Sequence, residues 1–484
     1  MADNTWIMPA PIRTTAMTRS TTNPRLIALI VASSFFMQAL DSAIISTSLP
    51  QMAQSFHVHP LDLSIGITIY LLSVAAFVPL SGWVADRFGA RNVFSLAIVI
   101  FTLASLACGM SESLLQFALA RAVQGLGGAL MVPVGRIVVL RNTEKSELLQ
   151  VTALITWPAM IAPVVGPALG GFITTYASWR WNFLLNIPLG MAGLALVYKF
   201  IPNYREAERT RLDLKGFLLS STALISLLYG LETFAHTKVD WLYPVALIVA
   251  GSLVGTWAVR HFWRTANPLL NLSPFKVHTF SIATLGAGMF SRIGISATPF
   301  LLPLMFQVGF GLSAWASGML ILAYFGGNLG MKTITTPTLR RFGFRSVLSV
   351  NAMASGISIL ACAFLSADTP TFAIVLVLLA AGLTRSMQFT SLNTLAFADI
   401  SVAQRSSSST LSSMLQQISM VLGVALAAFI LNAAEMVQGS KTMDMTDFRA
   451  AFAGVGLLSL LSSWMFLKLS RDAGCEVSGH RASH

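Results

Sequence analysis

Two long apolar runs are joined by the charged turn Gly82-Trp83-Val84-Ala85-Asp86-Arg87-Phe88-Gly89-Ala90-Arg91. Part of this turn recurs 254 positions later, where Asp86-Arg87-Phe88-Gly89-Ala90-Arg91 corresponds to Arg340-Arg341-Phe342-Gly343-Phe344-Arg345. The match continues at the same offset: Val93 falls on Val347, Ser95 on Ser349, Leu106 on Leu360, Ala107 on Ala361 and Cys108 on Cys362. The pattern indicates two parallel repeats, an arrangement in which many secondary transporters bind their substrate at the repeat interface.

The composition points to a membrane protein. Hydrophobic residues make up 55% of the 484 and charged residues only 10%, with a mean hydropathy of +0.71. Such values are typical of an integral membrane protein. The apolar runs are long and carry few charges, whereas the strands of a membrane barrel would give short alternating segments. We therefore predict an all-α integral membrane protein.

About fourteen transmembrane helices are predicted. They span residues 26–49, 63–85, 93–110, 114–138, 150–174, 182–201, 214–234, 241–262, 280–305, 314–337, 346–366, 370–390, 411–431 and 449–469. The first six and the last six form the two repeats, and the seventh and eighth are an inserted pair without a repeat partner. The predicted domains are an N-terminal six-helix repeat with a cytoplasmic tail (1–201), a linker with the two inserted helices (202–278), a C-terminal six-helix repeat (279–470) and a cytoplasmic tail (471–484).

The basic residues set the orientation, because cytoplasmic loops retain positive charge. With the N-terminus inside, only Arg180, Lys238, Lys441 and Arg449 would lie outside. Residues 1–24 have no apolar core of signal-peptide length, so we expect an uncleaved tail and both termini in the cytoplasm. The net charge of +12 is explained by topology and by contact with anionic lipid, and it requires no nucleic-acid partner.

Motifs for catalysis or metal binding are missing from the sequence. It has no phosphate-binding Gly-x-x-x-x-Gly-Lys loop and no His-Glu-x-x-His helix, and the three cysteines, Cys108, Cys362 and Cys475, lack paired metal-ligand spacing. We therefore expect no enzyme activity, no metal and no cofactor, with an ion gradient as the source of energy.

The repeats, the turn and the span count together resemble the major facilitator superfamily, and specifically its fourteen-span drug:proton antiporters of the EmrB/QacA type. The superfamily's loop motif between spans two and three matches Gly82, Asp86, Arg87, Gly89 and Arg91. The resemblance implies that Asp86 and Arg87 form a latch that holds neighbouring helix ends in the outward-facing state. The alternative is an ordinary cytoplasmic turn whose basic residues only set topology. Arg340 in place of Asp86 means that the second turn cannot form the same latch.

Span four contains Arg121-Ala122-Val123-Gln124-Gly125, which is similar to the family's Arg-x-x-Gln-Gly pattern. Burying the charge of Arg121 in an apolar helix is costly, so it needs an anionic or carbonyl partner. The resemblance implies a role in proton coupling, and a structural arginine bonded to backbone carbonyls is the alternative.

Span five contains Gly166-Pro167-Ala168-Leu169-Gly170-Gly171, similar to the antiporter signature of the family. Small residues let helices approach closely and Pro167 removes a backbone donor. We therefore expect Gly166, Pro167, Gly170 and Gly171 to form a kinked, tightly packed seam between the two halves.

The segment from Trp179 to Gly190 also resembles the family, at the start of span six. Its tryptophans are typical of an interfacial anchor, so we expect it to support family membership without a part in the chemistry.

Span one holds Gln38-Ala39-Leu40-Asp41, similar to the family's Leu-Asp motif. Asp41 is the only acidic residue well inside a predicted span. A carboxylate at that depth can take up a proton on one side of the membrane and release it on the other, so Asp41 is the predicted proton carrier. Gln38 is a predicted substrate contact.

The second half offers no acidic counterpart of Asp41. Instead Arg292 lies in span nine and Arg385 in span twelve, beside Gln388 and Asn393. These four side chains are further predicted substrate contacts, and the two arginines would hold an anion and repel a cation. The alternative is that both arginines satisfy carbonyls at helix breaks or extend towards the membrane surface.

The sequence thus predicts a proton-coupled exporter of drugs or other amphipathic small molecules, located in a bacterial-type inner membrane and working by alternating access. One alternative is an exporter of organic anions such as carboxylates. Another is a membrane sensor that kept the fold and no longer transports. The expected partners are a small-molecule substrate and the lipid bilayer, and a periplasmic adaptor remains open.

Overall fold

The computed structural model describes residues 23–58, 63–144, 147–202, 211–236, 241–312, 314–438 and 444–480. All regular elements in these segments are helices. The N-terminal half contains α1 (Pro24–Phe56), α2 (Ser64–Phe77), the 3-10 turn η2 (Val78–Leu80), α3 (Ser81–Phe88), α4 (Ala90–Gly109), α5 (Leu114–Arg141), α6 (Leu148–Tyr176), α7 (Arg180–Leu184) and α8 (Asn186–Phe200). The inserted helices are α9 (Leu214–His236) and α10 (Leu242–Arg264).

The C-terminal half follows after the 3-10 turn η4 (Ser273–Lys276). It contains α11 (His278–Thr284), α12 (Gly286–Leu304), the π-helical turn η5 (Met305–Gly309), α13 (Ala314–Ala363), α14 (Thr371–Ala398), the 3-10 turn η6 (Val402–Gln404), α15 (Arg405–Gln438), α16 (Met445–Phe466) and α17 (Cys475–Ser478). Helices suit these apolar runs because the membrane interior offers no water to satisfy backbone groups.

The described residues contain 12 helical stretches long and apolar enough to cross a membrane. One of them, Ala316–Ala363, is 48 residues long and contains two of the predicted spans, joined where Gly343 leaves helical geometry at φ 72°. The predicted span 150–174 falls on α6, a helix of 29 residues. Each of the predicted spans therefore falls on one helix or on consecutive helical segments, and the all-α membrane fold is confirmed.

Backbone geometry supports the duplication seen in the sequence. Gly89 has φ 91° between α3 and α4, and Gly343 has φ 72° at the matching turn inside α13. A positive φ strains residues with a side chain, so the two turns use glycine for the same reason. The helices α5 and α14, which occupy equivalent places in the repeats, are both 28 residues long.

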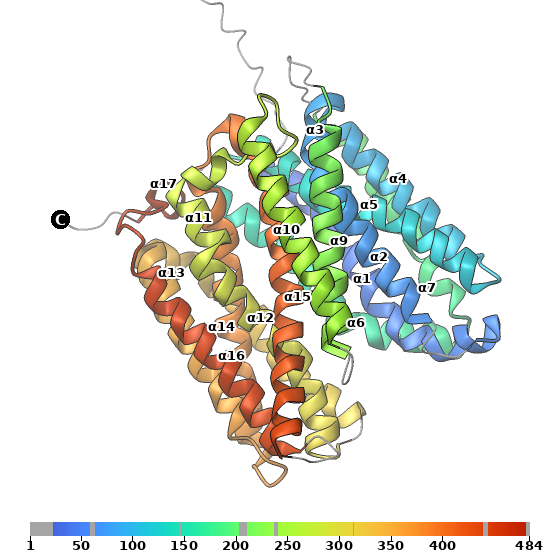
Figure 1. The fold of residues 1–484 in the computed structure, drawn as a ribbon, viewed down its shortest axis with the longest axis vertical. Helices are drawn as coiled ribbons and strands as arrows, with labels where there is room; N and C mark the ends of the chain where they lie inside the picture. The colour runs from blue at the N-terminus through green and yellow to red at the C-terminus, as the bar shows by residue number, and fades with distance from the viewer. Residues whose placement is uncertain are drawn as a thin grey trace, which may run out of the picture.

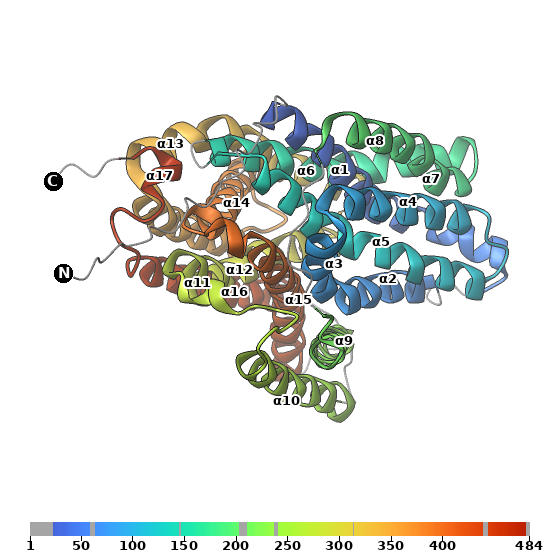
Figure 2. The same ribbon diagram turned by 90° about the horizontal axis from the view of Figure 1, so that it is seen from above.

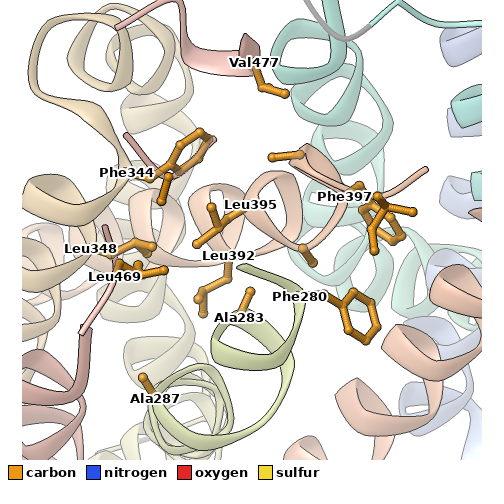
Figure 3. Packing of buried hydrophobic residues seen from close by; sticks show 14 of the residues in the cluster. Phe280, Ala283, Ala287, Phe344, Leu348, Leu392, Leu395, Phe397, Leu469 and Val477 are labelled. Atoms are coloured by element: carbon orange, nitrogen blue, oxygen red, sulfur yellow. The ribbon is translucent and has the colours of Figure 1, made fainter. Parts of the chain in front are cut away.

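The two halves lie side by side and spread apart towards the lower end of the view in Figure 1. We call the end that carries the Gly82–Arg91 turn the loop end. There the halves share a buried hydrophobic cluster, in which Leu140 and Leu148 of the N-terminal half join Leu339 and Phe397 of the C-terminal half. Figure 3 shows Phe344, Leu348, Leu392 and Leu395 within this cluster. The halves are therefore closed against each other at the loop end.

The inserted helices lie outside the two repeats. In Figure 2, α9 lies against α15 and α2, and α10 forms the outer edge. Thr68 of α2 donates to Glu232 of α9 at 2.9 Å, and the rings of Phe234 and Phe429 stack at 5.5 Å between α9 and α15. The inserted pair thus contacts both halves.

Candidate functional site

The carboxylate of Asp41 forms a buried ion pair with Arg121. Arg121 Nη1 lies 2.8 Å from Asp41 Oδ2, and each side chain is 1% exposed. Arg121 also donates from Nε to the carbonyl of Gly66 at 3.3 Å and rests on the ring of Tyr70, with 4.3 Å between Cζ and the ring centroid. The structure therefore brings together the two residues that the sequence predicted for proton coupling.

Amide side chains complete the shell of Asp41. Gln124 Nε2 donates to Asp41 Oδ1 at 2.9 Å, and Asn186 Nδ2 donates to the same oxygen at 2.8 Å. Both amides also reach Ser105 Oγ, at 2.7 and 3.1 Å. An ionised carboxylate only accepts hydrogen bonds, and three donors around Asp41 fit that form. Protonation of Asp41 would neutralise its carboxylate and leave the buried Arg121 without a counter-charge.

The segment that opens span six is only partly the interfacial anchor that the sequence predicted, because Trp181 is 58% exposed and Trp179 is buried. Trp179 is 2% exposed and Asn186 only 1%, because α7 and α8 turn this segment towards α1 and α4. Asn182 is also buried, and it donates to Ser48 at 2.7 Å and to Thr174 at 2.8 Å. Asn186, predicted to have no part in the chemistry, is thus a direct partner of Asp41.

A cavity of about 580 Å³ lies between the halves, next to this network. Its wall includes Gln38, Ser42 and Tyr70 beside the ion pair. Gln38 Nε2 donates to the hydroxyl of Tyr70 at 2.9 Å, which connects the wall to the ring beneath Arg121. Of the predicted substrate contacts, Gln38, Arg292, Arg385 and Asn393 line the cavity. A molecule in the cavity would therefore lie close to the proton-coupling residues.

Gln388, another predicted substrate contact, does not line this cavity. It is fully buried and accepts a hydrogen bond from Asn351 at 2.8 Å. Because its helix turns it towards α13, Gln388 packs inside the C-terminal half. Its predicted contact with substrate is not supported by this position.

Two further cations lie in the same region, and the sequence reasoning missed both. Arg136 of α5 lines the cavity and donates to Gln416 of α15 at 3.0 Å. Lys332 of α13 donates to Thr156 of α6 at 3.2 Å and also to Thr390 of α14. Each joins one half to the other. A basic residue inside a predicted apolar span, 114–138 for Arg136 and 314–337 for Lys332, was the signal that could have identified them.

The predicted latch is a contact between two helix ends. Asp86 Oδ1 accepts from Arg141 Nη2, at the end of α5, at 2.7 Å. Arg87 lies over the ring of Trp83 at 5.3 Å, and Arg91 donates to the carbonyl of Ile201 at 3.4 Å. Gly89 provides the turn described above.

The same turn meets the C-terminal half. A Cβ on Gly82 would lie 2.8 Å from Thr410 Oγ1 and 3.0 Å from Ser406 Oγ of α15, so any larger residue here would force these side chains of α15 to move. Arg405 at the start of α15 donates to the carbonyl of Leu140, beside Arg141. The latch therefore also involves Arg141 and Arg405, which the motif did not indicate.

The predicted seam at Gly166–Gly171 lies within one half rather than between the two. A Cβ on Gly166 would lie 2.6 Å from the Cβ of Ala43 in α1. Gly170 accepts from Asn182 at 3.4 Å, and a Cβ on Gly171 would meet no heavy atom within 4 Å. The side chain of Pro167 lies outside the described residues. The expectation of a seam between halves was wrong because this stretch of α6 packs on α1.

Residues 31–424 match the family model of the Major Facilitator Superfamily. The chain belongs to the major facilitator superfamily. A relative from Citrobacter koseri named putative multidrug resistance protein MdtD is 36% identical over 447 residues, covering 92% of this chain and 94% of the relative. The protein of the same name from Escherichia coli O6:H1 is 37% identical over 454 residues, covering 93% and 95%. The family membership predicted from the motifs is confirmed.

Solved structures of the superfamily share the fold. The proton:xylose symporter XylE bound to 6-bromo-6-deoxy-D-glucose aligns with a TM-score of 0.62 at 13% identity, covering 92% of this chain and 96% of that one. The human organic anion transporter MFSD10 (TETRAN) aligns with a TM-score of 0.60 at 14% identity, covering 92% and 97%. At these identities the likeness concerns the fold alone.

Proposed function

We propose that this protein is a proton-coupled secondary transporter that exports drugs or other amphipathic small molecules across a bacterial inner membrane. It moves its substrate without chemically changing it. Two relatives that match most of the chain carry the name multidrug resistance protein. One structural observation carries the proposal: a buried carboxylate–arginine pair beside a cavity between two repeats.

Asp41 carries the proton. In the described state its carboxylate accepts three hydrogen bonds and pairs with Arg121. Proton binding removes the ion pair and leaves Arg121 buried without its counter-charge, which favours a rearrangement of α1 against α5. Because Gln38 and Tyr70 join this pair to the cavity wall, substrate and proton can influence each other over a short path.

The loop end is the cytoplasmic gate. The described state is closed there by the hydrophobic cluster, by the hydrogen bond from Arg405 to the carbonyl of Leu140 and by the ion pair between Asp86 and Arg141. An exporter must open this gate to load substrate and close it to release substrate on the opposite side. The individual latch contacts are weak enough to break in each cycle.

Substrate-induced proton movement in everted membrane vesicles tests the proposal. The responses of wild type and Asp41→Asn to a panel of amphipathic dyes and small carboxylates are compared. The control variant is Glu232→Gln, which replaces an acidic residue outside the Asp41 network. We expect proton movement with at least one compound in wild type and in the control, and none in Asp41→Asn. The same response in Asp41→Asn, or no response to any compound in wild type, would overturn the proposal.

A further inference from the structure

The charged residues on the cavity wall all have the same sign. Arg136, Arg292 and Arg385 line it, and the wall includes neither aspartate nor glutamate among the described residues. The nearest buried carboxylate of the network, Asp41, already pairs with Arg121 and accepts from two amides. Lys332, between Thr156 and Thr390, adds a further cation nearby. The charged groups around the cavity therefore favour an anion over a cation.

Arg292 has an unused donor. The arginine is 3% exposed, and its Nη2 donates a long hydrogen bond of 3.3 Å to Asn393 Oδ1. Nη1 is buried and makes no hydrogen bond within the described part of the chain. A buried guanidinium without a counter-charge is costly, and an arginine with a purely structural role would have its donors satisfied.

Arg136 repeats this pattern from the other half. Nη2 donates to Gln416 at 3.0 Å, whereas Nη1 is buried and without a partner among the residues described. Arg121 provides the contrast, because its Nε and Nη1 bind the carbonyl of Gly66 and the carboxylate of Asp41. One arginine from each half thus holds a free donor beside the same cavity.

We propose that this cavity selects amphipathic anions, and that Arg292 and Arg136 bind the carboxylate or other acidic group of the substrate. This inference rests on the proposed function and names the substrate class of that site. Guanidinium groups pair with carboxylates through short, charge-assisted hydrogen bonds. Apolar wall residues accept the rest of the molecule: Phe35, Leu71, Phe325, Phe389 and Met420. A cationic compound of the same shape is repelled.

Binding of three matched fluorescent probes to purified full-length protein in detergent tests the inference. The probes are 1-pyrenebutyrate, its uncharged primary amide, and a pyrene of similar length that ends in trimethylammonium. We expect wild type to bind the carboxylate at least about tenfold more tightly than the amide, as one charge-assisted contact implies, and to bind the ammonium probe most weakly.

Substitutions then test whether Arg292 and Arg136 bind the carboxylate of the probe. Arg292→Gln should weaken carboxylate binding about tenfold and leave amide binding unchanged, whereas Arg292→Lys should recover part of the loss. Arg136→Gln should act in the same direction. Arg264→Gln, on the exposed surface of α10, is the matched control and should change nothing. Gel filtration and thermal melting identify any variant that fails to fold, and the wild-type preference among probes tests the inference independently of the variants.

An anionic lipid headgroup has the same chemistry as the proposed ligand. Octanoate and phosphatidylglycerol are therefore compared as competitors at equal charge concentration. We expect octanoate to displace 1-pyrenebutyrate and the lipid to have little effect. Displacement by the lipid alone would assign the arginines to lipid binding and overturn the inference.

The vesicle experiment separates the two proposals. If wild type prefers the ammonium probe but moves protons in exchange for cationic dyes, the anion inference fails while the proposed function stands. If no probe moves protons in wild type, the proposed function fails, and with it the inference that depends on it.

Discussion

The two repeats treat buried charge differently. In the N-terminal half, Asp41 and Arg121 form an ion pair in which Asp41 also accepts from two side-chain amides and Arg121 also donates to the carbonyl of Gly66. When α5 and α14, both 28 residues long, are aligned end to end, Leu378 of α14 falls on Arg121 of α5, and Leu378 is fully buried. Two cations of the C-terminal half, Arg292 and Arg385, line the cavity instead.

This difference shows how charged residues in a duplicated fold can take on different functions. A satisfied ion pair responds to protonation, because a single proton removes one partner. An arginine with an unused donor responds to an incoming anion. We therefore propose that the ion pair of the N-terminal half senses protons, that one arginine from each half, Arg136 and Arg292, binds substrate, and that the cavity connects the two events.

The largest expected effect comes from making the N-terminal half resemble the C-terminal half. Arg121→Leu leaves the carboxylate of Asp41 buried without its cation and should cost about 3–5 kcal/mol of stability. Adding Asp41→Asn removes the unpaired charge and should restore most of that loss. Chemical unfolding of the purified variants in detergent measures both values. Additive losses in the double variant would contradict a direct pairing in the N-terminal half.

A larger residue in place of Gly166 tests which helices the tightly packed seam joins. Gly166→Val places side-chain atoms against Ala43 and should cost about 1–3 kcal/mol, with loss of transport. Ala43→Gly should relieve the clash, because the close approach is between α6 and α1. Gly171→Val is the control, since its added Cβ meets no heavy atom within 4 Å. Failure of Ala43→Gly to rescue would return the seam to the interface between the halves.

A smaller effect is expected from the latch, which among the described residues is formed at the turn of the N-terminal repeat. Asp86→Asn weakens a partly exposed ion pair with Arg141 and should cost about 1 kcal/mol or less. The population open at the loop end should therefore rise about fivefold. Distances between spin labels on the ends of α3 and α15 measure this shift. Arg340→Asn, at the matching turn of the C-terminal repeat, is the control, and an equal shift there would remove the distinction between the two turns.

The smallest effect is expected outside both repeats, at Asp213 before α9. Partial burial raises the pKa of Asp213, but hydrogen bonds from the Gly216 and Leu269 amides and from His261 outweigh it, so the pKa lies below its ordinary value. A lowered folded pKa contributes stability that is present above the ordinary value and lost as the pH falls through the folded value. Asp213→Asn should remove this acid-side dependence in unfolding experiments. The pH profile of transport between about pH 5 and 8 should not change, and a shifted profile would place proton coupling partly in the inserted pair.

Local sequence patterns predicted the fold well because lipid restricts a spanning chain to few solutions. Apolar runs located the helices, and the shared glycine in two matching turns revealed the repeats. The pairing of Asp41 with Arg121 could be expected from cost alone, since each is a charged residue inside an apolar segment and they have opposite signs.

The sequence did not predict the features of the site that depend on which neighbour a helix face contacts. Asn182 and Asn186 lie four residues apart on one helical face, a spacing that could have indicated a polar contact inside the protein. The tryptophans beside them suggested the membrane surface instead. The motif around Gly166 shows close packing but not its partner, and no local pattern could choose between α1 and the opposite half.

The central claim is that Asp41 carries the proton while the cavity arginines hold the substrate. An antiporter carries the two in alternation, so substrate binding should release a proton from Asp41. The most direct measurement is proton release on addition of saturating 1-pyrenebutyrate to purified protein in weakly buffered detergent solution. We predict release in wild type and in Arg292→Gln at saturation, and binding without release in Asp41→Asn. Undiminished release in Asp41→Asn would contradict the account.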